Sequence, residues 1–236
     1  MTHDLLRAFA SAPRRAAILL DVDGVLAPIV PRPEDACVPD ETLAELGRLV
    51  TDYALVACVS GRPRPELEEL VPVDGLSLVG EHGLELAPEA EQWAEQVAAF
   101  GRGVDWPAEQ KPLSVSFHFR RADDEAAARA YLTRVAEAAT REGLVPRWGR
   151  MVLEVRPPVA ADKGTAVRAL LVRARLSRAL YAGDDTTDLD AFAGLDGLEL
   201  AVRVAVASDE SPAGLLDAAD LTVTGTDGVL ALLRAL

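Results

Sequence analysis

Two carboxylates, Asp21 and Asp23, form the first group in this sequence that could do chemistry. They follow an apolar run at residues 17–20 and precede Gly24, a pattern typical of a tight turn at the end of a buried strand. In such a turn one carboxylate can attack phosphorus, while the other handles protons on the leaving group and on water. Calcium loops also open with this spacing, but the closing Glu of those loops does not follow here. The alternative is a solvated turn with two capping acids.

Two further segments could bind a phosphate group. Ser60 and Gly61 end a second apolar run, at residues 54–59, and offer a hydroxyl and backbone N–H groups that can cradle a phosphate. Lys163 opens a predicted helix, where an ammonium can neutralise phosphate charge. The only other lysine of this arginine-rich chain is Lys111, which suggests that a compact ammonium is needed at both places. Taken alone, an ordinary turn and a solvated lysine are the alternatives.

Three acids lie together after another apolar run, at residues 179–182. Asp184, Asp185 and Asp188 would repel each other at the end of a strand, and a bound divalent cation would remove that repulsion. Because hard oxygen ligands suit Mg²⁺, the cluster predicts a magnesium site. A cluster of acids at the N-terminus of a helix is the alternative.

These groups are expected to meet at one edge of a sheet. Apolar runs alternate with segments of helical periodicity, which indicates a parallel sheet covered on both faces. The expected strands are residues 17–20, 54–59, 76–79, 179–182, 200–207 and 221–223, and the expected helices are 40–50, 163–174, 187–193 and 226–236. In open α/β sheets, sites lie at the carboxyl ends of the strands, so the groups can converge.

The middle of the chain has a different pattern. Residues 113–119 and 151–156 alternate in period two and flank an alanine-rich helical segment at 124–142, which indicates a small sheet with one exposed face. The interval from Ser60 to Lys163 is too long for a single connection. We therefore predict an α/β fold, with a Rossmann-like parallel-sheet core and an inserted, smaller α+β cap. The expected bounds are 1–86 and 158–236 for the core and 87–157 for the cap.

The composition disfavours several classes of partner. The formal net charge of −14 would repel nucleic acid and anionic membranes, and no apolar run is long enough to cross a bilayer. The N-terminus lacks the order of a signal peptide, so we expect a cytoplasmic protein, and a monomer with an oligomer as the open alternative. Cys58 lies in an apolar run and is expected to be a buried, inert thiol.

The order and spacing of the four motifs resemble those of the haloacid dehalogenase superfamily of phosphatases and phosphomutases. The matching residues are Asp21, Asp23, Ser60, Lys163, Asp184, Asp185 and Asp188. By this resemblance Asp21 is the nucleophile and Asp23 the general acid/base. The resemblance also implies that Mg²⁺ lies between Asp21, the backbone carbonyl of Asp23 and Asp184. Asp185 and Asp188 would then touch the ion or lie just beyond its ligands.

Longer segments resemble the trehalose-6-phosphate phosphatases within that superfamily. The segments are residues 21–30, 59–63, 80–83, 153–157 and 183–188, and the resemblance covers nearly the whole chain. Val22, Val25, Phe119 and Leu189 stand where that family usually has Phe, Thr, Tyr and Glu. None of these departures removes a catalytic group, but they leave room for a different sugar phosphate.

The resemblance also implies a sugar-binding site. In the cap its residues are Glu109, Lys111, Arg120, Arg150 and Glu154. In the core they are Arg62, Glu81, His82 and Gly83. Charged groups suit such a site because they hydrogen-bond the many hydroxyls of a disaccharide. A surface pair of Arg150 with Glu154 and a simple turn at His82 are the alternatives.

By this resemblance, the chain is a Mg²⁺-dependent phosphatase that hydrolyses trehalose 6-phosphate to trehalose and phosphate through an aspartyl-phosphate intermediate. Its partner is then a small sugar phosphate. The alternatives are a phosphatase for a related compound, such as a validoxylamine-type or sucrose phosphate, a phosphomutase, and a catalytically silent sugar-phosphate-binding protein. The complete set of catalytic motifs argues against the silent alternative.

Overall fold

The chain folds into two compact units. This computed structural model describes residues 2–149, 151–209 and 211–236. The first unit comprises Met1–Gly83 and Asp162–Leu236, and the second comprises Leu84–Ala161. The second unit is therefore an insertion between two parts of the first, and it is described separately below.

A parallel sheet forms the centre of the first unit. Among the described residues its six strands are β1 (Ala17–Leu20), β2 (Leu55–Val59), β3 (Ser77–Val79), β8 (Arg178–Gly183), β9 (Leu200–Ala207) and β10 (Leu221–Thr224). All neighbouring strands run parallel, in the order β10-β9-β8-β1-β2-β3. Strands β1 and β2 are apolar at every position, as a sheet covered on both faces requires. The predicted parallel-sheet core is thus confirmed.

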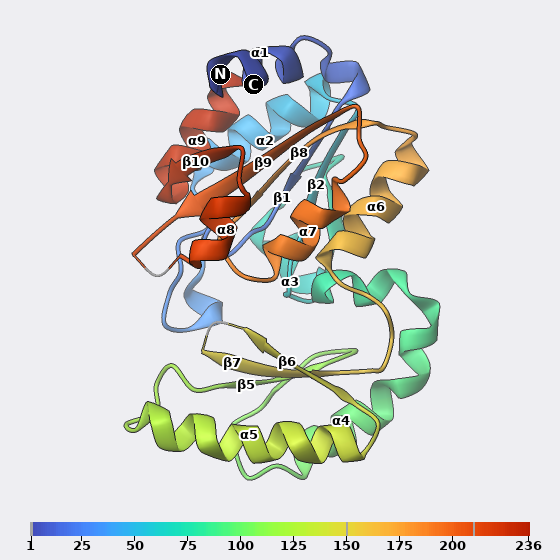
Figure 1. Ribbon diagram of the computed structural model, residues 1–236, viewed down its shortest axis with the longest axis vertical. Coiled ribbons are helices and arrows are strands. Elements are labelled where there is room, and N and C mark those ends of the chain that lie inside the picture. Colours follow the sequence, from blue (N-terminus) through green and yellow to red (C-terminus); the bar gives the residue numbers. More distant parts are fainter. Residues whose placement is uncertain (1, 150, 210) are drawn as a thin grey trace. The chain divides into compact units, whose positions relative to one another are not determined.

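Helices cover both faces of this sheet (Figure 1). One face carries α1 (Thr2–Ala10), α2 (Asp40–Asp52), α3 (Arg64–Leu70) and α9 (Gly225–Ala235), and the other carries α6 (Lys163–Ala174), α7 (Asp188–Gly194) and α8 (Ala213–Ala218). Short 3-10 helices lie at Pro13–Arg15, Pro33–Asp35, Glu81–Leu86 and Pro88–Trp93. Alternate residues of β1 enter different cores: Ile18 lies in one cluster with Leu46 of α2, and Leu19 in the other with Leu171 of α6.

The strand order reverses between β1 and β8, and this reversal creates the place for a site. From β1 the chain moves outward through β2 and β3 on one side, and through β8, β9 and β10 on the other. Helices that leave two such neighbouring strands diverge, which opens a crevice at the carboxyl ends of the strands. Asp21 follows β1 and donates its backbone N–H to the carbonyl of Ala182 in β8 (2.9 Å). Asp184 follows β8, so both acids lie at this crevice.

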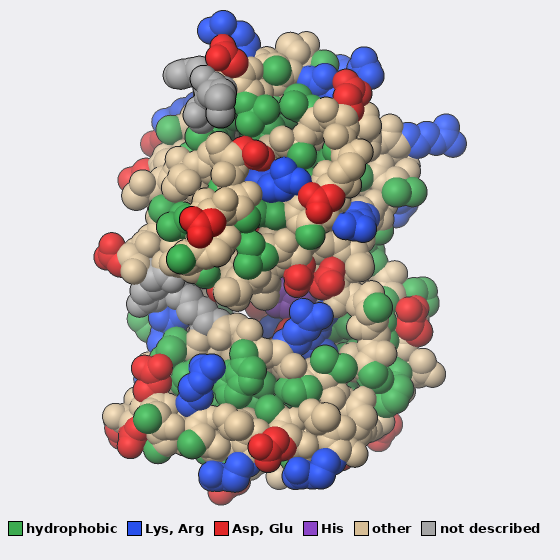
Figure 2. All heavy atoms as spheres, viewed as in Figure 1, with side chains coloured by type: hydrophobic (Ala, Val, Ile, Leu, Met, Phe, Trp, Pro, Cys, Tyr) green, Lys and Arg blue, Asp and Glu red, His purple; other side chains and the backbone are tan. Residues whose placement is uncertain are grey.

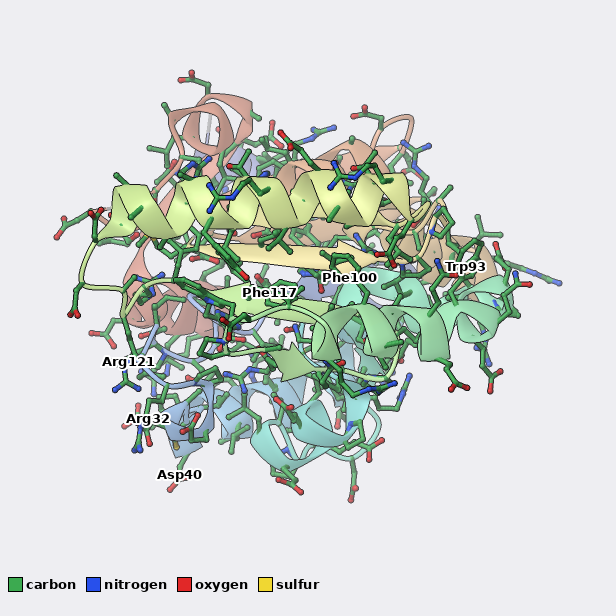
Figure 3. All side chains as sticks on the ribbon, turned by 90° about the horizontal axis from the view of Figure 1, so that it is seen from below. Arg32, Asp40, Trp93, Phe100, Phe117 and Arg121 are labelled. Atoms are coloured by element: carbon green, nitrogen blue, oxygen red, sulfur yellow. The ribbon has the colours of Figure 1, made fainter. Side chains whose placement is uncertain are left out.

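The second unit is a small antiparallel sheet with helices on one face. Its strands are β4 (Glu109–Gln110), β5 (Val115–His118), β6 (Val145–Gly149) and β7 (Val152–Arg156), in the order β4-β5-β7-β6, and its helices are α4 (Ala94–Arg102) and α5 (Glu125–Arg141). Phe117 of β5 and Phe100 of α4 (Figure 3) lie in the buried core. Leu132 of α5 belongs to the same core. Ser116 points to the opposite, polar face, where it pairs with Glu154.

Charged side chains of both signs lie on the exterior. On the face shown in Figure 2, Lys and Arg side chains are scattered among Asp and Glu side chains. None of the helices in the described residues is long and apolar enough to span a bilayer. The expectation that nucleic acid is not a partner stays a prediction.

The two cysteines give a test of the buried core. Cys58 in β2 is fully buried, as predicted, whereas Cys37 is exposed. Burial raises the pKa of the Cys58 thiol, and the nearby Asp21 adds to this effect. Because the thiolate is the reactive form, a disulfide reagent such as DTNB should label Cys37 alone in the native protein and both thiols after denaturation. Rapid release of two equivalents from the native protein would contradict this packing.

Candidate active site

A buried group of charges lies at the centre of the candidate site. The Nζ of Lys163 is 2.7 Å from Oδ2 of Asp21 and 2.7 Å from Oδ1 of Asp188. The exposed fractions of these residues are 2%, 6% and 0% respectively. Because a buried charge is costly without a partner, each member of this group depends on the others. Three segments that are distant in the sequence therefore have to meet here.

Burial also changes the ionisation of the group. Burial raises the pKa of Asp21 well above its ordinary value; Lys163 opposes this effect, and the carboxylates of Asp188 and Asp184 add to it. Burial lowers the pKa of Lys163, but Asp188 and Asp21 outweigh it, so the pKa lies above its ordinary value. Lys163 therefore stays charged. A cation beside Asp21 would favour the ionised carboxylate that a nucleophile needs.

A capping box sets the position of Lys163. The Asp162 side chain accepts a hydrogen bond of 2.7 Å from the N–H of Thr165, and Thr165 Oγ1 accepts one of 2.9 Å from the N–H of Asp162. These bonds satisfy N–H groups that the start of a helix leaves without an intrahelical partner. As a result, α6 begins at Lys163. The local sequence therefore fixes the backbone position from which the Lys163 side chain extends.

Asp184 adds a third carboxylate beside Asp21. Among the described residues, one carboxylate oxygen each of Asp21, Asp184 and Asp188 lie within 4.8 Å of one another. This spread is about twice the Mg–O distance of roughly 2.1 Å. Asp184 lies directly over Gly24, where an added Cβ atom would come within 2.2 Å of Asp184 Oδ2. Two of the three predicted acids, Asp184 and Asp188, are therefore buried together with Asp21, whereas Asp185 is half-buried, and oxygen atoms of this kind suit a hard divalent cation.

Hydrogen bonds within the segment 184–188 fix the side chains of Asp185 and Asp188. Asp185 Oδ1 accepts bonds from the N–H of Thr186 (2.7 Å) and from its hydroxyl (3.2 Å). Asp188 Oδ2 accepts bonds of 2.9 Å from the N–H groups of Asp184 and Asp185. Asp188 thus ties the turn together, whereas Asp185 is turned toward Thr186.

Asp23 is held by Arg62, a residue that the sequence had assigned to the substrate. Nε of Arg62 lies 2.7 Å from Asp23 Oδ2, and Nη2 donates to Asp23 Oδ1 at 2.8 Å. Arg62 also donates to the carbonyl of Pro33 (3.0 Å) and contacts Glu66 (3.3 Å). Such a two-pronged arginine–carboxylate contact fixes both side chains. In this arrangement the candidate acid/base faces Arg62.

The segment from Glu81 to Gly83 folds onto the turn at Ser60. Glu81, His82 and Gly83 all have positive φ angles, of 47°, 54° and 93°. Two non-glycine residues in a row in this conformation are strained, and strain of this kind gathers at functional sites. The N–H of His82 donates to the carbonyl of Ser60 (2.8 Å). The imidazole lies against Gly61, where an added Cβ would come within 2.5 Å of Nε2, so His82 is placed beside the candidate phosphate cradle.

In the second unit, charged residues gather around Glu154. Ser114 Oγ donates to Glu154 Oε1 (2.9 Å), and Lys111 Nζ lies 3.9 Å from the same oxygen. Arg156 Nε lies 3.7 Å from Glu154 Oε2, and Lys111 Nζ lies 3.7 Å from Glu109 Oε1. The structure therefore brings together three of the predicted cap residues: Glu109, Lys111 and Glu154.

The two other predicted cap residues are Arg120 and Arg150, and some residues of both units were not predicted. Arg120 is an exposed residue of the turn after β5, and Arg150 lies outside the described residues. The hydroxyl of Tyr181 donates to Asp188 Oδ1 at 2.7 Å. This residue was not predicted from the sequence, although a hydroxyl within the apolar run of β8 could have indicated it. Arg156, which faces Glu154, could have been found by its even spacing from that residue on one strand.

Comparison with known proteins gives the family. A model of the trehalose-phosphatase family matches residues 19–107 and 107–214. The chain belongs to the trehalose-phosphatase family. A trehalose-phosphate phosphatase of Mycobacterium marinum is 32% identical over 225 residues, which cover 85% of this chain and 57% of that protein. A Mycobacterium tuberculosis protein described as an uncharacterized glycosyl hydrolase is 36% identical over 205 residues, which cover 76% of this chain and only 15% of that protein.

Solved structures show the same fold for this trehalose-phosphatase family member. The C-terminal domain of the Candida albicans trehalose-6-phosphate phosphatase superposes with a TM-score of 0.81 at 23% identity, over 99% of this chain and 95% of that one. Haloacid dehalogenase-like hydrolases share this fold. The chain spans little more than half of the M. marinum phosphatase and a small part of the M. tuberculosis protein, so the activities of those whole proteins are not carried over by the match alone.

Gly24 offers a test of the acidic cluster. Its φ of 81° disfavours a side chain, and a Cβ atom would displace the Asp184 carboxylate. Gly24→Ala should weaken Mg²⁺ binding at least about tenfold and destabilise the fold by roughly 1–2 kcal/mol, measured by calorimetric titration and by urea unfolding.

Gly47 in α2 is the matched control, because an added Cβ meets nothing within 4 Å. Gly47→Ala should leave Mg²⁺ binding unchanged and stabilise the protein by about 0.5–1 kcal/mol. Equal Mg²⁺ affinity in both variants would show that Asp184 is not a ligand at this turn.

Proposed function

We propose that this chain is a Mg²⁺-dependent phosphatase that hydrolyses trehalose 6-phosphate to trehalose and phosphate. The observation that carries the proposal is the buried contact of Lys163 with Asp21 and Asp188, beside Asp184, at the carboxyl ends of β1 and β8. Membership of the trehalose-phosphatase family supports the substrate. A cytoplasmic location and a monomeric state stay predictions from the sequence.

The reaction proceeds in two displacements at phosphorus. In the first, a carboxylate oxygen of Asp21 forms a bond to phosphorus while the bond from phosphorus to the sugar oxygen breaks, and Asp23 gives that oxygen a proton. In the second, Asp23 takes a proton from water, the water oxygen bonds to phosphorus, and the bond to Asp21 breaks. The contacts of Asp23 with Arg62, at 2.7 and 2.8 Å, use one lone-pair site on each carboxylate oxygen and leave the other sites for the proton.

The remaining core residues bind charge. Asp21 and Asp184, with the backbone carbonyl of Asp23, would hold Mg²⁺, which supplies screening between the anionic nucleophile and the anionic phosphate. Lys163 holds Asp21 in place and neutralises charge that develops on the phosphoryl oxygens. Ser60 and Gly61 offer a hydroxyl and a backbone N–H to the same oxygens.

The cap would read the sugar. The core residues account for phosphate and metal but contain few groups that could recognise a disaccharide. Glu109, Lys111 and Glu154 supply acceptors and donors on one polar sheet face, where partners such as Ser114 fix their geometry. Fixed charged groups suit hydroxyl recognition because little side-chain entropy is lost on binding.

The nucleophile is tested by Asp21→Asn. The amide is isosteric but cannot form the acyl phosphate, so turnover should fall at least about a thousandfold with little change in melting temperature. Asp217→Asn, on the exposed side of α8, is the control and should keep the wild-type rate of phosphate release. Near-wild-type turnover by Asp21→Asn would exclude this mechanism.

The metal is tested by its removal. Chelation with EDTA should abolish phosphate release, and added Mg²⁺ should restore it. Because the ion relieves repulsion among buried carboxylates, Mg²⁺ should also raise the melting temperature of the protein without substrate. Full activity after exhaustive chelation, with no metal found by elemental analysis, would contradict the proposal.

The substrate is tested with a panel of phosphate esters. Wild-type protein should release phosphate from trehalose 6-phosphate with a higher kcat/KM than from glucose 6-phosphate, sucrose 6-phosphate or a validoxylamine-type phosphate. Comparable cleavage of glucose 6-phosphate would refute the disaccharide assignment, and transfer of phosphate back to sugar would indicate a mutase.

Glu154→Gln separates recognition from chemistry. The amide keeps the volume of a buried side chain but loses its charge, so kcat/KM for trehalose 6-phosphate should fall about ten- to a hundredfold. Hydrolysis of p-nitrophenyl phosphate should change less than about twofold. Glu137→Gln on the exposed side of α5 is the control. An equal loss on both substrates would mean that Glu154 supports the fold of the cap and does not read the sugar.

A further inference from the structure

Tyr181 is a buried polar residue that the proposed reaction does not use. It lies in β8, three residues before Asp184, and its side chain has no exposed surface. Its ring packs edge-on against Phe192 of α7, with 6.1 Å between centroids. Its hydroxyl donates to Asp188 Oδ1 at 2.7 Å. Burial of Phe at this position would cost less free energy than burial of Tyr, because no hydroxyl would lose its contact with water. The presence of the hydroxyl therefore needs an explanation.

The partner of Tyr181 has no acceptor position left over. Asp188 Oδ1 accepts from Lys163 Nζ (2.7 Å) and from Tyr181 (2.7 Å). Oδ2 accepts from the N–H groups of Asp184 and Asp185, both at 2.9 Å. A carboxylate offers about four lone-pair sites, two on each oxygen, and these four bonds use them all. A cation could bind Asp188 only if one of these bonds broke.

The backbone around Asp188 is shaped for this arrangement. An added Cβ at Gly183 would come within 2.2 Å of Asp188 Cγ, so the strand leaves space that the carboxylate fills. Asp184, in contrast, lies over Gly24 next to Asp21. Two acids four residues apart are thus placed for different tasks, with Asp184 toward the metal position and Asp188 toward Lys163.

We infer that Tyr181 is a positioning residue for the phosphatase reaction, acting through Asp188 to hold the Lys163 ammonium against Asp21, and that Asp188 is not a metal ligand. The inference rests on the proposed function. Two donors on Oδ1 fix the plane of the Asp188 carboxylate, which in turn fixes the ammonium. Without the phenol, two backbone N–H groups still hold Oδ2, but Lys163 is the one donor that remains on Oδ1, so the direction of the lone pair that faces the ammonium is less restricted.

Tyr181→Phe is the direct test, because it removes only the hydroxyl. We expect kcat for phosphate release to fall about tenfold, since a hydrogen bond to a charged group that orients a catalytic ammonium is lost. KM and the Mg²⁺ dissociation constant, measured by calorimetric titration without substrate, should stay within about twofold of wild type. A role in folding alone would lower the melting temperature and leave kcat unchanged below it.

Tyr53→Phe is the matched control. Tyr53 is also buried, at 3% exposed, and its hydroxyl donates to the carbonyl of Leu236 at 3.2 Å, far along the chain from the acidic cluster. It should lose stability in the same way as Tyr181→Phe while kcat stays at the wild-type value. A kcat for Tyr181→Phe equal to that of Tyr53→Phe would overturn the positioning role.

Asp188→Asn tests the second half of the inference, and it decides the matter if Tyr181→Phe does not fold. Its Mg²⁺ dissociation constant should stay within about threefold of wild type, while kcat falls at least about a hundredfold because an amide group would face Lys163. Asp184→Asn should lose Mg²⁺ binding. Equal loss of Mg²⁺ binding in both variants would overturn the inference.

A folded wild type that releases no phosphate from any ester would refute the proposed function, and the inference would fall with it.

Discussion

The contact of one ammonium with two carboxylates in a buried place is the constraint on which this structure depends. Lys163 bridges Asp21 and Asp188 at 2.7 Å, and none of the three is more than 6% exposed. Removing Lys163 would leave two buried carboxylates without a counter-charge in a medium that cannot solvate them, so the segments that carry the three groups are held together. The same burial raises the pKa of Asp21, and a cation beside it would favour the ionised form.

The ends of strands and the start of one helix place the three residues of this contact. The reversal of strand order between β1 and β8 opens one crevice, and the residues after both strands enter it. A capping box begins α6 at Lys163, and bare backbone at Gly24 and Gly183 lets two carboxylates approach closely. Chemistry is thus set by strand ends and helix starts, while the inserted unit is free to carry a different recognition surface.

Local patterns predicted the parts that depend on local chemistry. The acids after β1 and β8 were found because each follows an apolar strand. Partners across long separations were not found: Arg62 was assigned to the substrate, but the structure pairs it with Asp23. The residues around Asp23 contain no pattern that predicts a contact with Arg62. Strand β6 was also missed, since it lies at a sheet edge, contains Pro146 and has no fully buried residue among those described to give an alternating pattern.

The central claim is that Asp21 carries the phosphoryl group during turnover. Borohydride reduces an acyl phosphate of Asp to homoserine, so quenching the enzyme during hydrolysis of trehalose 6-phosphate and mapping its peptides reports the acceptor directly. The account predicts homoserine at residue 21, dependent on substrate and Mg²⁺, and at no other aspartate. Homoserine at Asp23 or Asp184, or none under conditions of rapid turnover, would contradict it.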